Sequence, residues 1–117
     1  MLTIYHNPRC SKSREGLTYL TRNGYEFKVI LYLHKPFKTE EFKKLLMKLN
    51  LKPEQVVRTQ EEIYRKELKG RTFTYEEWVR IIIQNPKLLQ SPIVEGKYRA
   101  VIADPPERSE EVRSVNS

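Results

Sequence analysis

Hydrophobic and polar positions predict a strand, a helix and a second strand at the start of the chain. Residues 2–5 alternate and are rich in β-forming types, which favours a short strand. Residues 11–23 place Leu17 and Leu20 on one helical face and end in Asn-Gly, a common helix stop. Residues 27–33 are nearly apolar throughout, which predicts a strand buried on both faces and therefore central in its sheet.

The middle of the chain has helical spacing. Apolar residues recur at i, i+3, i+4 and i+7 over residues 42–49, so we predict an amphipathic helix with Thr39 as its N-cap. Further helical stretches are predicted at residues 60–68 and, after Thr74 as N-cap, at residues 75–84.

The C-terminal part predicts a β-hairpin followed by a polar tail. Residues 91–103 hold β-branched residues on both sides of a turn at Gly96. The β-α-β start implies two parallel strands with a right-handed crossover, and the hairpin completes a four-stranded mixed sheet flanked by helices. This α/β order is the thioredoxin-like plan with a helical insertion at about residues 39–86. We expect one domain over residues 1–107 and a polar tail over 108–117, whose first residues favour a short helix.

Composition limits the chemistry that is available. The chain has 117 residues, of which 38% are hydrophobic, enough for one domain with a core. No apolar run approaches the roughly 18 residues that span a bilayer, and no signal peptide is evident, so we expect a cytoplasmic protein with no membrane partner. The single cysteine, Cys10, and only two histidines exclude an internal disulfide and a multi-cysteine metal site. We therefore expect no metal and no bound cofactor.

The charge distribution favours anionic partners. The net charge is +7, and residues 104–117 hold four acidic and two basic residues, which leaves +9 on residues 1–103. Such a body attracts small oxyanions, anionic thiols or nucleic acid. Because the basic residues are spread over every predicted helix and no recognition motif is present, we expect no nucleic-acid binding.

Cys10 stands just before the N-terminus of the first predicted helix. The free N–H groups there stabilise a thiolate and can hold an oxyanion. Arg9, Lys12 and Arg14 add positive charge nearby. A lone cysteine is often buried as a small hydrophobe, but polar residues flank this one on both sides, which favours a reactive thiol with a lowered pKa. Its C-x-x-S spacing to Ser13 lacks a resolving cysteine, so a redox cycle needs an external thiol.

Residues 4–14 (IYHNPRCSKSR) closely resemble the active-site segment of the glutaredoxin-linked arsenate reductase (ArsC) family. Segments within residues 57–68, 85–94 and 105–107 agree with the family in order and spacing. The resemblance covers roughly residues 2–107. It implies a thioredoxin-like fold and the reduction of arsenate to arsenite, with glutathione as co-substrate and glutaredoxin as the partner that resolves a mixed disulfide.

The resemblance also implies roles for individual residues. Cys10 corresponds to the nucleophile, and His6 to a residue that helps to lower the pKa of that thiol. Arg58 corresponds to an arginine that binds the oxyanion. Pro92 corresponds to a cis-proline that shapes the thiol-binding groove. The further residues that we expect at the oxyanion site are Ser11, Lys12, Arg14 and Arg99.

Two positions depart from the family pattern and leave alternatives open. Ser91 and Asp104 stand where the family usually has arginines that contact the oxyanion. Arg99, Lys97 or Lys12 are candidates to replace them, and the chain is alternatively a glutathione-dependent thiol reductase with another substrate. A third alternative, of another class, is a redox-responsive module that resembles RNA polymerase-binding regulators. That branch has C-x-x-C, and this chain cannot form such a disulfide.

Overall fold

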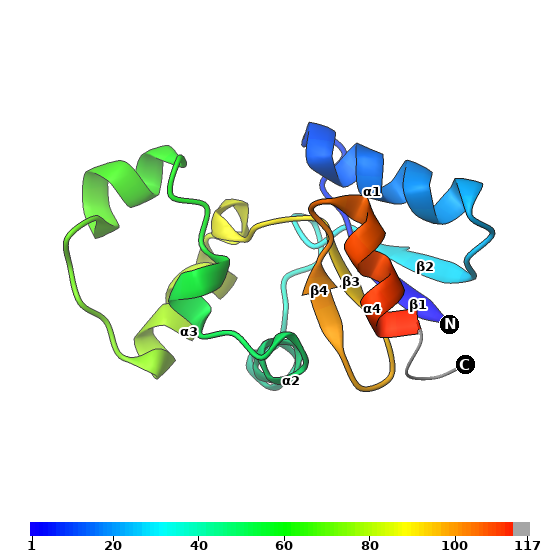
Figure 1. Ribbon diagram of the computed structural model, residues 1–117. Helices are drawn as coiled ribbons and strands as arrows, with labels where there is room; N and C mark the ends of the chain where they lie inside the picture. Colours follow the sequence, from blue (N-terminus) through cyan, green and yellow to red (C-terminus); the bar gives the residue numbers. More distant parts are fainter. Residues whose placement is uncertain (114–117) are drawn as a thin grey trace. The chain divides into compact units, whose positions relative to one another are not determined.

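The computed structural model describes residues 1–113, which form two compact units (Figure 1). The first unit combines Met1–Lys35 with the described residues from Ser91 onward. The second unit is Pro36–Gln90, which contains the segment predicted as a helical insertion. None of the described helices is long and apolar enough to cross a bilayer.

The first unit is built on a four-stranded mixed sheet with the strand order β2-β1-β3-β4. Strand β1 (Leu2–Tyr5) pairs in parallel with β2 (Phe27–Ile30), and α1 (Ser11–Arg22) makes the crossover between them. On its other side β1 pairs antiparallel with β3 (Ile93–Glu95), which continues through the hairpin into β4 (Ala100–Ile102). The predicted β-α-β unit, hairpin and thioredoxin-like fold class are confirmed.

The segment that was expected to be the central strand lies instead at the edge of the sheet. β2 ends at Ile30, and the chain then enters a turn. Val29 and Leu31 are 43% and 40% exposed, which a strand buried on both faces does not allow. The prediction was wrong because an apolar run reports β-propensity and not the number of neighbouring strands. The hairpin pairs with the free side of β1, so β1 becomes central and β2 keeps an open edge.

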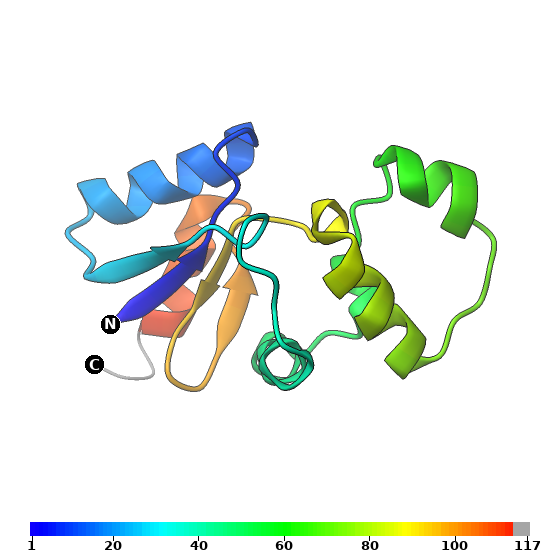
Figure 2. The ribbon, with the colours of Figure 1, turned by 180° about the vertical axis from the view of Figure 1, so that it is seen from behind.

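Helices α1 and α4 (Glu110–Arg113) cover the same face of this sheet (Figures 1 and 2). Their apolar residues meet the inward-facing residues of three strands in one core: Leu2, Ile4, Leu20, Val94, Val101, Ala103 and Val112. The 3-10 helix Pro106–Ser109 leads directly into α4. The predicted polar tail thus contains a folded part, since Val112 is fully buried; residues 114–117 of that tail lie outside the described residues.

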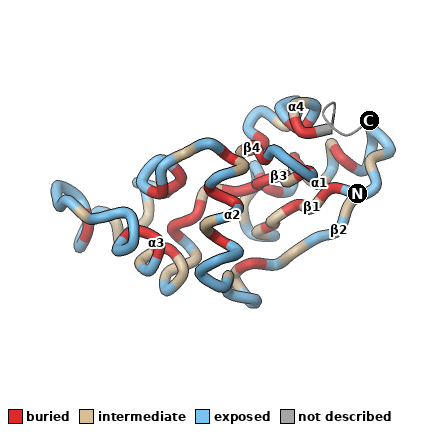
Figure 3. The backbone as a smooth tube through the Cα atoms, turned by 90° about the horizontal axis from the view of Figure 1, so that it is seen from below, coloured by how far each residue is buried: buried red, intermediate tan, exposed pale blue. Residues whose placement is uncertain are grey.

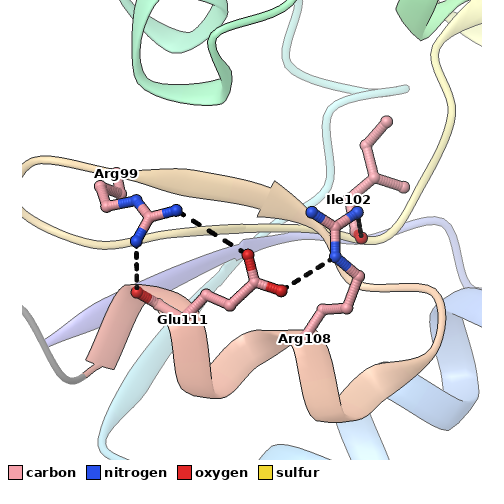
Figure 4. A network of polar contacts seen from close by, with 4 residues as sticks. All are labelled: Arg99, Ile102, Arg108 and Glu111. Atoms are coloured by element: carbon pink, nitrogen blue, oxygen red, sulfur yellow. Dashed lines mark hydrogen bonds and ion pairs between the residues drawn. The ribbon is translucent and has the colours of Figure 1, made fainter.

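Polar contacts tie α4 to the hairpin (Figure 4). Glu111 lies between two arginines, with Oε1 at 3.8 Å from Arg99 Nη2 and Oε2 at 3.1 Å from Arg108 Nε. Arg99 also donates to the backbone carbonyl of Glu111, and Arg108 to that of Ile102. All three charged side chains are partly exposed, so each ion pair contributes at most about 1 kcal/mol. The apolar core therefore does more than these contacts to hold α4.

The second unit is built from helices. α2 (Thr39–Leu49) packs against α3 (Tyr75–Gln84), and both helices bury one face (Figure 3). The residues at helical spacing are buried as predicted, except Tyr75 in the first turn of α3, which is exposed. Between them lie the 3-10 helix Pro53–Val56 and the π-helix Tyr64–Leu68, and a short 3-10 helix, Pro86–Leu88, follows α3. The helix predicted at residues 60–68 is therefore mostly a π-helix, a type that apolar spacing does not distinguish from an α-helix.

The helix caps were predicted correctly for α3 and wrongly for α2. Thr74 Oγ1 accepts the N–H of Glu77, and the Glu77 carboxylate accepts the N–H of Thr74. In α2, Thr39 is already helical and Lys38 is the N-cap residue, whose N–H donates to the Glu41 carboxylate. The glutamate supplies the acceptor, so this cap does not depend on a threonine hydroxyl.

Candidate active site

Cys10 is the N-cap residue of α1, at the end of the loop that follows β1. Its backbone is extended (φ −94°, ψ 123°), and its N–H donates to the Asn7 carbonyl at 3.0 Å. The Cys10 carbonyl accepts the N–H of Arg14 and so begins the helical hydrogen bonding. The side chain is partly buried. Because the first N–H groups of a helix have no intrahelical partner, the backbone here favours an anion beside the thiol, as the sequence predicts.

Ser91 and Pro92 lie at the same end of the sheet as Cys10. β3 begins directly after Pro92, and its first residue pairs with the last residue of β1. The Cys10 loop follows β1, so it lies at the same end of the sheet as Ser91 and Pro92. Cys10 Sγ lies 4.0 Å from the Ser91 carbonyl oxygen. The Ser91–Pro92 peptide bond is cis, which agrees with the resemblance. The thiol and the proline, 82 positions apart in the sequence, therefore belong to one site.

The Ser91 side chain brings a polar atom to this site. Ser91 is only 5% exposed, and its hydroxyl oxygen has no hydrogen-bond partner among residues 1–113. Buried hydroxyls are normally paired, so this one has bonding capacity that a bound molecule can satisfy. It is neutral and short, and it does not provide the charge of the arginine that is usual in the family.

Ser13 organises the Cys10 loop, a role that the sequence analysis missed. The fully buried Ser13 hydroxyl lies 2.7 Å from His6 Nδ1 and accepts the N–H of Asn7 at 2.9 Å. The first turn of α1 is thereby tied to the end of β1. The sequence carried a signal for this role, because Ser13 shares a helical face with Gly16 and Leu20, which are also buried.

His6 is buried beside the same loop. Burial lowers the pKa of His6 from its ordinary value of 6.5; a hydrogen bond with Ser13 acts in the opposite direction, and the positive charge of Arg14 lowers it further. The lowered pKa favours the neutral imidazole at neutral pH. In that form His6 acts on the Cys10 loop through its hydrogen bond with Ser13 and not through a positive charge.

The buried His6 predicts a loss of stability on acidification. Its pKa is lower in the folded chain than in the unfolded chain, so the unfolded state takes up the proton first. The free energy of unfolding is expected to fall as the pH drops below 6.5, until the pH passes the pKa of the folded form. In His6→Asn, whose amide can still bond Ser13, this component is absent and the profile is flatter. Urea unfolding between about pH 5 and pH 8 measures the slope.

The control is His34→Asn, because His34 is the other histidine of the chain and is exposed. It should keep the wild-type slope. Equal slopes in the wild type and His6→Asn would show that His6 is not the group responsible.

The predicted anion-binding residues Ser11, Lys12 and Arg14 gather in the first turn of α1. Ser11 is its first residue and is exposed. Lys12 Nζ lies 2.8 Å from Asp104 Oδ2, and Arg14 donates to a backbone carbonyl of the preceding loop at 2.9 Å. The charge of Lys12 is thus matched by a carboxylate beside it. Among residues 1–113, no three His, Cys, Asp or Glu side chains are grouped so as to hold a metal ion.

Arg99 does not lie with this group. β3 runs antiparallel to β1, with Glu95 opposite Thr3, so the hairpin turn lies near the start of β1, whereas the Cys10 loop follows its end. The Arg99 side chain is engaged with Glu111 on α4. The expected use of Arg99 or Lys97 at the oxyanion site does not fit this topology, because the direction of the strands carries both residues to the opposite end of the sheet.

Arg58 belongs to the second unit. Its N–H donates to the Leu88 carbonyl at 2.7 Å, next to the isolated bridge between Val57 and Leu89. Its Nε lies 3.6 Å from a Glu61 carboxylate oxygen, and its side chain is 22% exposed. The backbone around Arg58 is therefore well ordered by local contacts, and its oxyanion role remains a prediction from the resemblance.

Together, the sheet topology and a cysteine at a helix N-terminus beside a cis-proline define a thioredoxin-like protein built around one thiol. Residues 5–112 match the model of the ArsC family. An arsenate reductase of Haemophilus influenzae is 36% identical over 106 residues, which cover 89% of this chain and 91% of the relative. The uncharacterized protein YfgD of Escherichia coli K12 is 39% identical over 111 residues, 93% of each chain.

Solved structures agree with this assignment. The structure of an arsenate reductase from Vibrio cholerae superposes with a TM-score of 0.88 at 35% identity, over 95% of this chain and 96% of the other. A putative arsenate reductase from Yersinia pestis gives a TM-score of 0.87 at 39% identity, over 96% of this chain and 100% of that one. The chain belongs to the ArsC family.

Proposed function

We propose that this protein reduces arsenate to arsenite, with Cys10 as the nucleophile, glutathione as co-substrate and glutaredoxin as its redox partner. The observation that carries the proposal is the position of Cys10 at the N-cap of α1, 4.0 Å from the carbonyl that precedes the cis-proline Pro92. Membership of the ArsC family and the names of several relatives support the same activity.

The reaction is a two-electron transfer from two thiols to arsenic. The Cys10 thiolate attacks arsenate and forms an S–As bond, and one arsenate oxygen takes up protons from the solvent and leaves as water. The thiolate of glutathione then forms an S–S bond with Cys10, and the electron pair of the S–As bond stays on arsenic, which leaves as arsenite. A glutaredoxin thiol attacks the mixed disulfide and releases Cys10 as a thiolate. The chain has no second cysteine, so the external thiols are required for turnover.

The residues around the thiol have separate roles in this proposal. The N–H groups at the start of α1, with Ser11 and Arg14, bind the oxyanion where negative charge is favoured. Pro92 forms a wall of the groove that receives the glutathione thiol. The role of Arg58 in oxyanion binding is carried over from the resemblance. A dependence on glutathione and glutaredoxin also places the protein in the cytoplasm, where thiols are kept reduced.

A coupled assay tests the proposal. The protein is mixed with glutathione, glutathione reductase, glutaredoxin and NADPH, and NADPH oxidation is followed with and without arsenate. We expect oxidation that needs arsenate, glutathione and glutaredoxin together. Absence of arsenate-dependent oxidation, in a preparation whose Cys10 still reacts rapidly with iodoacetamide, would reject arsenate as the substrate while leaving the thiol chemistry intact.

A second candidate is a glutathione-dependent reductase with a less highly charged substrate. The observation that favours it is Asp104, whose carboxylate pairs with Lys12 in the first turn of α1. The same assay with low-molecular-weight disulfides in place of arsenate distinguishes the two. The third alternative, a disulfide-switched binding module, gains no support, because the position of the second cysteine is taken by Ser13, whose hydroxyl bonds the Cys10 loop.

A further inference from the structure

We propose that Asp104 determines the charge selectivity of the Cys10 site by neutralising Lys12. The ion pair disfavours multiply charged anions at the thiol relative to neutral or singly charged molecules. This inference rests on the proposed role of Cys10 as the nucleophile.

The fold places Asp104 at the same end of the sheet as the Cys10 loop, although the two residues are 94 positions apart in the sequence. β4 pairs with β3, with Ile102 opposite Ile93, so the residues after β4 return beside those that precede β3. The N–H of Ala103 donates to the Pro92 carbonyl at 2.9 Å, which fixes this return next to the cis-proline. Asp104 therefore leaves the sheet at the end where Cys10 Sγ meets the Ser91 carbonyl.

Lys12 contacts Asp104 from the first turn of α1. It lies two residues after Cys10 in the first turn of α1, and its Nζ is 2.8 Å from Asp104 Oδ2. The pair joins the helix that begins at the thiol to the strand end beside the proline. The ion pair in the first turn of α1 therefore has no net charge, where Lys12 by itself would add one positive charge near the Cys10 N-cap.

The pair matters for the local potential more than for stability. The two side chains are 61% and 42% exposed, and exposed ion pairs contribute little to folding. The interaction of a nearby charge with an anion grows in proportion to the charge of the anion. When Asp104 cancels the charge of Lys12, the loss in binding free energy is therefore twice as large for a dianion as for a monoanion. A neutral molecule loses none. Charge selectivity at Cys10 follows from this difference.

Alkylation of Cys10 with a neutral and an anionic reagent tests the proposal directly. The second-order rates of iodoacetamide and iodoacetate are measured at low ionic strength for the wild type, Asp104→Asn, Lys12→Gln and the double variant. Both reagents attack the thiolate, so the ratio of the two rates cancels changes in the thiolate fraction. We expect the iodoacetate-to-iodoacetamide ratio to rise about threefold to tenfold in Asp104→Asn and to fall in Lys12→Gln. The double variant should return close to the wild type.

Glu76→Gln is the matched control. Glu76 forms an ion pair of similar length with Lys43, at 2.9 Å in the second unit, and the substitution changes the net charge by the same amount. Its ratio should stay within about twofold of the wild type, because Glu76→Gln changes the net charge and leaves the Lys12–Asp104 ion pair in place. A ratio in Asp104→Asn no higher than that of Glu76→Gln would overturn the proposal and leave the ion pair as a tether only.

The alkylation ratio does not depend on arsenate turnover, so the two proposals fail separately. If the wild type shows no arsenate-dependent NADPH oxidation but the ratio shifts as expected, the selectivity role stands and the substrate assignment fails. If the wild type turns over arsenate and the ratio does not shift, the assignment stands and the selectivity role of Asp104 fails.

Arsenate should also protect Cys10 from iodoacetamide at a lower concentration in Asp104→Asn than in the wild type. Equal protection would count against the proposal.

Discussion

Cys10→Ser is expected to show no arsenate-dependent NADPH oxidation under conditions in which the wild type turns over. A serine hydroxyl is not ionised near neutral pH, so the variant lacks the nucleophile, and it cannot form the mixed disulfide that glutaredoxin resolves. We expect a loss of at least about a thousandfold, to the background rate of glutathione and glutaredoxin alone. Incubation with oxidised glutathione, followed by mass measurement, should give one glutathione adduct in the wild type and none in the variant.

The loss is not expected to come from unfolding. Cys10 is the N-cap residue of α1, and serine is among the best N-cap residues because its oxygen accepts an N–H of the first turn. The free energy of unfolding of Cys10→Ser should therefore equal or exceed that of the wild type, by up to about 1 kcal/mol. Residual arsenate-dependent turnover in a folded variant would show that another group attacks arsenate.

Gly16→Ala is expected to lower the free energy of unfolding and to displace α1, because Gly16 lies against the ring of Pro92. A Cβ at Gly16 would lie 2.7 Å from Pro92 Cγ and 3.3 Å from Pro92 Cβ. The proline ring cannot rotate away, so α1 has to move, and such overpacking typically costs about 1–3 kcal/mol. Alanine returns up to about 1 kcal/mol through its higher helix propensity. We expect a net loss of about 1–2 kcal/mol in urea unfolding, because the steric term is the larger.

The same displacement is expected to slow the reaction at Cys10, since Cys10 lies at the N-terminus of α1. Shifting the helix away from Pro92 changes the approach of the glutathione thiol, and we expect kcat/KM for glutathione to fall at least about tenfold. Thr18→Ala, an exposed position on the same helix, is the control and should keep both stability and turnover. If Gly16→Ala is as stable and active as this control, α1 does not need the close approach to Pro92.

Several elements were determined locally and could be predicted from the sequence. The α3 helix begins at Thr74 because a threonine and a glutamate three residues later cap each other, whatever the rest of the chain does. The β-α-β start and the hairpin at Gly96 follow from alternation, apolar spacing and turn residues. The edge position of β2 could not be predicted in this way, because it depends on which side of β1 the hairpin occupies.

The candidate site also has some features that the sequence predicts and others that only the tertiary structure decides. The sequence by itself determined that one cysteine stands before a helix N-terminus among basic residues, because that arrangement lies within eleven consecutive residues. Only the tertiary structure decided that Ser13 holds the loop, that Asp104 neutralises Lys12 and that Arg99 lies at the opposite end of the sheet. Net charge and composition do not show which residues pair in the folded chain. Such pairings arise when strand direction and register bring residues from the two ends of the chain to the same end of the sheet, or carry them to opposite ends.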